Sequence, residues 1–397
     1  PSGNYFFRQN SIQDNLNRNH RLNLRLDHRF TDQTSLLFTT AASLTSSRSE
    51  LENASLNITA EGQLQNTSDQ ISFTEGGNQN LQSSILLRHR FAKAGRTISL
   101  GMDLTAAGSD QEGSLEALNR FMGQDPREER LLQDNLQDNR SQNLAASMNY
   151  TEPLGNRRFI EFNYRVIRNT NDVDQSVFDL FTDSLTGQII HIPNPALSNQ
   201  YNNLYLYHRA GINLRINRDD WSMTLGGSYQ TSTLNGEVRG EAVSERSYYH
   251  LLPVFRVNYQ FSTFRRIMLD AETSVQEPGI LQMQPLIDNR DPLNIYVGNP
   301  ELQPAYRYRV NLRFHSFNPV SSFGYFAFIS AEYSDRPITN SVFVTEDLIR
   351  IISPVNTDQS INLRANLNTN FQIPALKSRI MLGTTLSRNQ TTDILNL

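Results

Sequence analysis

Arginine side chains recur at alternate positions in the segment that follows Pro304. Arg307, Arg309 and Arg313 lie on one side of a strict alternation whose other side is aromatic or aliphatic. A guanidinium group keeps its charge and forms forked hydrogen bonds with carboxylates and amides. The pattern therefore predicts a wall of fixed polar contacts. A structural charge network is one interpretation of this wall, and a ligand site is the other.

Four further arginines occupy the same kind of position on other segments. Each lies opposite an apolar face in a long alternating stretch, and each would be costly to expose to hydrocarbon. We therefore expect all seven arginines to face a polar interior. The additional residues are Arg25, Arg209, Arg256 and Arg364.

Residues that could support catalysis or hold a metal occur without a recognisable motif. The seven histidines stand outside any Gly-x-Ser-x-Gly or His-Glu-x-x-His context, and several are ordinary side chains of alternating segments. Cysteine is absent, so the chain has neither disulfides nor thiolate metal ligands. The sequence thus predicts a protein that is not an enzyme and that has no catalytic, cofactor-binding or metal-binding residues.

The elements that position the arginines are long β-strands. After Gly298-Asn299-Pro300 the alternation runs for about 10 residues, roughly what a tilted strand needs to cross a bilayer. Its apolar side carries Tyr306, Tyr308, Val310, Leu312 and Phe314. Similar stretches recur along the chain and predict about 14 long strands. The others lie within 21–30, 35–45, 81–91, 97–105, 143–150, 158–167, 204–216, 221–231, 248–261, 266–275, 323–333, 361–371 and 379–388.

Bulk composition limits the class of protein. Only 38% of the 397 residues are hydrophobic, and no window offers the run of about 18 apolar residues that a membrane helix requires. A helical membrane protein is therefore excluded, whereas a β-barrel is not, because half of each strand faces a polar lumen. The net charge of −4 and the lack of a basic tract give no indication of nucleic-acid binding.

Connection lengths decide between a membrane barrel and a soluble sandwich. Short turns, such as 93–96 and 217–220, alternate with long polar connections, such as 46–78, 108–142 and 169–203. A consistent short and long split means that the two ends of a meander face different environments, as in outer-membrane barrels. A Greek-key sandwich would scatter its loop lengths, and its dry core could not pair so many polar side chains. Within the second long connection, Leu115, Leu118 and Phe121 predict a helix-like piece that continues past Pro126.

Several motifs also resemble a known family. Residues 197–203 with 208–211, Gln284 to Asn289, Gly298 to Pro304, and 317–319 look like the barrel region of TonB-dependent receptor-like outer-membrane proteins of Bacteroidetes. In that family a periplasmic plug domain and a TonB-contacting box precede the barrel. The resemblance implies that residues 1–397 are one barrel domain, a fragment of a longer chain whose whole barrel has about 22 strands. The seven arginines would then line its lumen or face the plug.

The resemblance implies a function as well as a fold. We expect an antiparallel up-and-down transmembrane barrel in the bacterial outer membrane, in contact with lipid, that binds an unknown solute through its extracellular loops and admits it to the periplasm. TonB and the plug would be partners outside this segment. The alternative is a structural or interaction barrel that binds a surface lipoprotein or another envelope partner without transport.

Overall fold

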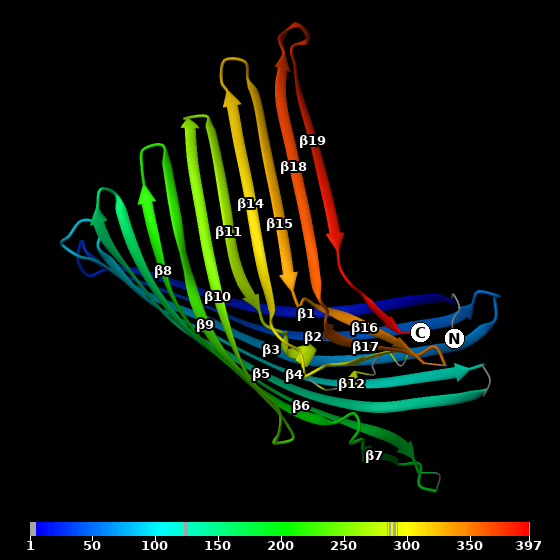
Figure 1. Ribbon diagram of the computed structural model, residues 1–397. Coiled ribbons are helices and arrows are strands. Elements are labelled where there is room, and N and C mark those ends of the chain that lie inside the picture. Colours follow the sequence, from blue (N-terminus) through cyan, green and yellow to red (C-terminus); the bar gives the residue numbers. More distant parts are fainter. Residues whose placement is uncertain are drawn as a thin grey trace.

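The protein is built from two β-sheets (Figure 1). A computed structural model describes residues 5–122, 126–183, 185–283, 285, 287–288, 291, 293–345 and 347–396. Parts of the Gln284 to Asn289 motif, namely residues 284, 286 and 289, lie outside this described set. In the larger, 15-stranded sheet, all long strands follow one another in chain order, each antiparallel to the next. The predicted meander of about 14 long strands is confirmed.

The long strands differ in length between the two halves of the chain. The first six have 25 to 29 residues, whereas β14, β15 and β18 have 13 to 15. In sheet order the strands are β1 (Tyr5–Arg29), β2 (Thr34–Thr59), β3 (Leu64–Arg90), β4 (Thr97–Phe121), β5 (Arg127–Gly155), β6 (Arg158–Thr182), β8 (Asn199–Asn217), β9 (Trp221–Val238), β10 (Glu241–Ser262), β11 (Arg265–Gln276), β14 (Ala305–Asn318), β15 (Phe323–Asp335), β18 (Gln359–Ile373) and β19 (Ser378–Gln390).

Short turns join the strands at one end of the larger sheet, as the sequence predicts. The turn between β3 and β4 shows why glycine is needed there, because Gly95 has φ +86°. A Cβ on Gly95 would also lie 2.9 Å from a ring carbon of Phe159. Tight turns of this kind hold neighbouring strands in register and keep this end of the sheet compact.

The prediction of long loops at the other end was largely wrong. Strands β2 and β3 run through 46–78, and β4 and β5 occupy most of 108–142. The expected helix-like piece is strand: Leu115 and Phe121 lie on one face of β4 and Leu118 on the other. Pairing with β3 and β5 satisfies the backbone of β4, and this long-range effect outweighs a local three-residue spacing. Within 169–203, β6 continues to Thr182 and pairs with β7 (Ile189–Pro193) in a small hairpin, and β8 begins at Asn199.

The smaller sheet comes from the two remaining long connections and the C-terminal end. Its order is β12 (Ile287–Asp288), β13 (Asn294–Val297), β17 (Arg350–Asn356), β16 (Ile338–Val344) and β20 (Ile394–Asn396). Strands β16 and β17 form a hairpin in the connection between β15 and β18. The only helical pieces among the described residues are α1 (Ile280–Met283) and a 3-10 turn (Pro374–Leu376), and neither has the length or the apolar character to cross a membrane.

The smaller sheet lies in the hollow of the curved larger sheet (Figure 1). Asn57 of β2 and Asn66 of β3 donate side-chain hydrogen bonds to the carbonyl oxygens of Leu348 and Asp347, at 3.5 and 2.5 Å. A second contact is the molecule's buried cluster, formed by Tyr201, Tyr205, Leu234, Met283 and Leu302, with Ile338 of β16 packed against it. The connections beyond β11 and β15 are therefore folded back against the sheet.

Candidate functional site

All seven arginines singled out from the sequence lie on one face of the larger sheet, here called the polar face. Directly paired residues of neighbouring strands share a face, so the register can be followed across the sheet. One row runs from Arg25 through Thr39, Ser84, Asp103, Ala145 and Ile167 to Tyr207, two residues from Arg209. Further rows join Arg209 with Gln230 and His250, Arg256 with Asp270, Glu272 with Arg309, and Ser330 with Arg364. Arg307 and Arg313 share this face with Arg309 because they alternate with it.

The polar face is also the face that the smaller sheet covers. Asn57 and Asn66 hold the loop at Asp347 and Leu348. Each lies an even number of residues along its strand from the β2 or β3 member of the row that contains Arg25, so both share the face of Arg25. Tyr205 and Leu234 of the buried cluster are paired with each other on this face as well. Since the smaller sheet occupies the hollow in Figure 1, the polar face is the concave one.

Carboxylates pair with several of the arginines. The Nε and Nη2 atoms of Arg309 lie 2.8 and 2.6 Å from Oε2 of Glu332, and Arg307 lies 4.0 Å from the same carboxylate. Arg256 contacts Glu272 at 3.0 Å and Asp270 at 3.6 Å. Sequence reasoning missed these acidic partners, although their alternation on β11 and β15 could have indicated them. This part of the polar face is a charge network.

The other arginines have different surroundings. Arg209 donates two hydrogen bonds to Oε1 of the buried Gln230, at 2.9 and 2.5 Å, and its guanidinium lies 5.5 Å from the Tyr207 ring centre. The guanidinium of Arg313 lies 5.6 Å from the Phe328 ring centre. Arg25 lines a cavity of about 480 Å³ on β1–β4, far along the sheet from the charge network. Arg364 lies on β18, one strand beyond Glu332. The seven arginines share a face but do not converge on one point.

Beside the charge network, the buried cluster contributes phenol groups. Tyr205 donates a hydrogen bond of 2.9 Å to Oε1 of Glu277, in the connection after β11. Tyr201 is fully buried, and burial raises the pKa of its phenol to about 12. Both tyrosines stay neutral at physiological pH and hold the folded-back connection through packing and a neutral donor.

The opposite face, here called the apolar face, carries exposed aliphatic and aromatic side chains across the sheet. Leu312 is paired with Leu269 and Ile329 there, and the pattern extends to both edges. A contiguous apolar surface of this extent is unfavourable in water and marks contact with another apolar phase. Its exposed members include Leu22, Leu24, Met102, Phe162, Ile212, Leu251, Val310, Ile329, Leu367 and Leu386.

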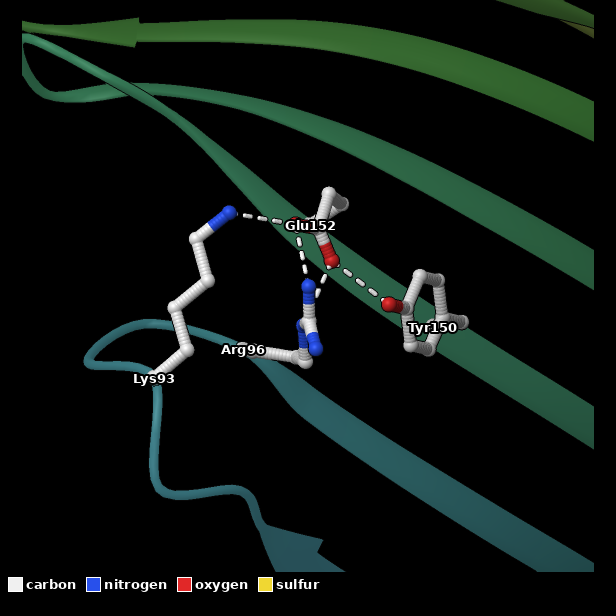
Figure 2. Close-up of polar contacts among 4 residues, drawn as sticks. All are labelled: Lys93, Arg96, Tyr150 and Glu152. Atoms are coloured by element: carbon white, nitrogen blue, oxygen red, sulfur yellow. Dashed lines mark hydrogen bonds and ion pairs between the residues drawn. The ribbon is translucent and has the colours of Figure 1, made fainter.

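At the short-turn end an ion cluster ties two hairpins together (Figure 2). Glu152 accepts hydrogen bonds from Lys93 at 2.6 Å, from Arg96 at 2.7 and 2.8 Å, and from Tyr150 at 2.5 Å. The contacts with Arg96, then those with Lys93 and Tyr150, hold the pKa of the Glu152 carboxyl well below its usual range. The cluster thus includes both a lysine and an arginine. Because the Glu152 carboxylate already accepts hydrogen bonds from three side chains, we assign the cluster a structural role.

The chain belongs to the outer membrane protein beta-barrel family, which it matches over residues 89–395. It is thus an outer-membrane β-barrel protein. Among solved structures it is similar to the siderophore receptor PiuA from Acinetobacter baumannii, with 9% identity and a TM-score of 0.49 over 98% of this chain and 64% of that one. It is also similar to the copper transporter OprC, with 10% identity and a TM-score of 0.49 over 98% and 62%.

A third similar structure is BauA, the ferric preacinetobactin receptor of Acinetobacter baumannii. The identity is 10% and the TM-score 0.47, over 99% of this chain and 63% of that one. The chain therefore spans less than two thirds of the length of these structures. The comparison with curated proteins found no similar sequence.

Proposed function

We propose that this chain forms the barrel wall of a TonB-dependent receptor that binds a solute through its extracellular side and admits it to the periplasm. In this proposal the seven arginines line the lumen or contact a plug domain. The plug and the TonB-contacting segment belong to parts of the protein outside this chain, and the whole barrel has about 22 strands. The motifs shared with receptor-like proteins of Bacteroidetes support the same assignment.

One observation carries the proposal: a continuous polar face, concave and partly covered by folded-back connections, stands opposite an apolar face on all the long strands. A strand crosses the hydrocarbon with about 9–11 residues, so the 25 to 29 residues of β1–β6 project well beyond it. They do so at the end opposite the short turns. This arrangement supports a water-accessible interior with a deep extracellular vestibule, which a receptor for a large solute needs.

Deletion of the full-length gene tests the proposal. Wild-type, deletion and complemented cells would be compared for uptake of labelled ferric chelates, oligosaccharides and peptides, with and without a protonophore that removes the energy TonB transmits. We expect at least one solute whose uptake falls on deletion, returns on complementation and stops with the protonophore. Unchanged uptake of every solute, together with a stoichiometric lipoprotein in pull-downs, would instead identify the interaction barrel.

A further inference from the structure

On the projecting ends of β1–β6 the polar face has a broad uncharged stretch, which stops short of Arg127 and Glu129 on β5 and of Asp179 on β6. Asn19, Thr45, Asn78, Ser109 and Asn139 form one row there, and the rows beyond it consist mainly of asparagine, glutamine, serine and threonine. We call this surface the amide wall. It comprises the polar-face positions within residues 9–19, 45–57, 66–80, 105–121, 131–145 and 167–177.

The other face of the same strand ends is strongly charged. Glu75 is paired with Glu112, and Asp110, Asp138 and Asp174 form a row across β4, β5 and β6. These strand segments therefore contain many charged residues, and the register directs them all away from the amide wall. The lack of charge is a property of one face and does not follow from local composition.

A cavity of about 370 Å³ opens on the amide wall between β3 and β6. Two of the three rows that line it belong to the polar face, and except for Ala107 and Val173 their side chains are amides and hydroxyls. The row between them, which includes Arg140 and Asp172, also lines the cavity, but the register directs its side chains to the other face. The polar side chains that point to this face are Asn78, Asn80, Ser109, Asn139, Ser141 and Asn171.

Hydrogen bonds within the sheet use only part of this polar surface. Asn139 donates to Oγ of Ser109 at 3.0 Å, and Asn171 donates to Oδ1 of Asn203 at 2.7 Å. The Oδ1 atoms of Asn80 and Asn171 have no donor among the described residues, although the Asn171 side chain is only 2% exposed. A buried acceptor without a partner costs free energy, and a hydroxyl group that enters the cavity would supply the missing donor.

We infer that this cavity is a binding subsite for an uncharged, polyhydroxylated solute, that is, a neutral oligosaccharide. Amide and hydroxyl groups offer donors and acceptors in alternation, which matches the hydroxyl groups of a sugar. An ionic ligand would lose hydration at the wall and gain no opposite charge there. An apolar ligand would leave the amides unpaired. The inference rests on the proposed function, because it supposes that solutes pass along the concave face.

Calorimetry with the full-length protein in detergent tests the ligand class. The probes are maltohexaose, cellohexaose and chitohexaose, with an oligogalacturonate hexamer and ferric citrate as charged counterparts. We expect at least one neutral hexamer to bind, and at least 10-fold more tightly than either charged compound. Binding of a charged compound alone, or of none of the five, overturns the inference.

Substitutions locate the subsite. Asn139→Ala and Asn171→Ala each remove one or two hydrogen-bonding groups, and each should weaken the neutral hexamer about 3- to 10-fold. Gln142→Ala is the matched control, because Gln142 is an exposed amide on the other face of β5. This variant should bind the hexamer as tightly as wild type does. Equal losses in the control and in the two wall variants would overturn the subsite. Heat-modifiable mobility on gels checks assembly, and Asn139→Asp, which keeps the side chain's size, replaces any variant that fails to assemble.

The cellular uptake assay separates this inference from the proposed function. If ferric citrate uptake depends on the gene while no neutral hexamer binds, the subsite is wrong and the receptor survives. If a neutral hexamer binds at the wall but no solute enters the cell through the protein, the subsite survives and transport is wrong.

Discussion

Two regions of the polar face differ in how their polar groups are satisfied. On β11, β14 and β15, both Arg307 and Arg309 form ion pairs with Glu332. The carboxylates of Asp270 and Glu272 form ion pairs with Arg256. On the amide wall, by contrast, no polar-face position is charged, and acceptors such as Oδ1 of Asn80 lack a donor among the described residues. In the charged region each of these carboxylates is paired with an arginine, although Nε of Arg307 has no hydrogen-bond partner among the described residues. On the amide wall, the groups without a partner are uncharged acceptors.

The difference follows from position along the strands. The charge network lies on short strands, at the level where the apolar face is continuous, and paired charges are the form in which arginine is tolerated close to hydrocarbon. The amide wall lies on the projecting ends, where both faces of the sheet meet water and no such pairing is required. We therefore expect substitutions in the first region to affect assembly and those in the second to affect binding.

The largest effect should come from a charge placed on the apolar face at the level of the charge network. Leu312→Arg should prevent assembly, because an arginine near the middle of the hydrocarbon costs about 2–4 kcal/mol in such barrels. Arg313→Leu, one residue along β14 and on the polar face, should still give a heat-modifiable barrel. Gel mobility of both variants after expression in outer membranes measures this.

Spin labels make the same test independent of assembly. A label at residue 312 should be accessible to oxygen dissolved in lipid and shielded from a polar relaxation agent, with the reverse at residue 313. A protein that stays in solution without detergent and buries residue 312 from both reagents would end the barrel interpretation, and with it the contrast between the two regions.

A smaller effect is expected within the charge network. Glu332→Gln should lower the free energy of unfolding by about 0.2–1 kcal/mol, because both arginines are partly exposed and such pairs contribute little individually. A double-mutant cycle with Arg309→Gln measures the coupling. Ser330→Ala, on the same face of β15, serves as a control that leaves the pair intact. If the cycle shows no coupling but the Arg309→Gln variant takes up less solute, Arg309 is part of a ligand site.

The sequence predicts the membrane-level part of this fold well, because apolar and polar residues alternate there. Residues 306–315 show the alternation clearly, and the strand that contains them was confirmed. On the projecting ends, charged residues alternate with uncharged polar residues instead. In β5, Asp134, Asp138 and Arg140 alternate with glutamine and asparagine, so both faces are hydrophilic and a hydrophobic pattern cannot reveal the strand.

The candidate site could be predicted only as a face. Strand parity is sufficient to group Arg25 with Thr39 and Arg309 with Glu332 once the register is known. The register, the folded-back connections and the contact of Asp347 with Asn66 all depend on residues far apart in the chain. No local signal specifies them, because loop closure and strand pairing are decided by the whole sheet.

The contact between the smaller sheet and the strand ends beside the amide wall should respond to the loss of a single ion pair. Asp347→Ala removes the 2.8 Å contact with Arg127, whose guanidinium also lies 4.1 Å from the Phe121 ring centre. Both groups are partly exposed, so the cost in global stability should be below about 1 kcal/mol. Spin labels at residues 61 and 343 should report a broader distance distribution by pulsed EPR. Asp358→Ala, in the turn before β18, is the control, and equal broadening there would contradict a specific contact.

The smallest effect should arise farthest from both regions, at Glu152. The folded-state pKa of this carboxyl is lowered by Arg96, Lys93 and Tyr150, so its stabilising contribution is present above the unfolded value of about 4.3 and is lost as the pH falls below it. Glu152→Gln lacks this contribution at every pH. The thermal midpoints of wild type and variant should therefore differ modestly at neutral pH and converge in acid. Sugar binding at the amide wall should be the same in both proteins. A difference in midpoint that grew as the pH fell would mean that the carboxyl is protonated more readily in the folded protein, contrary to its three donors.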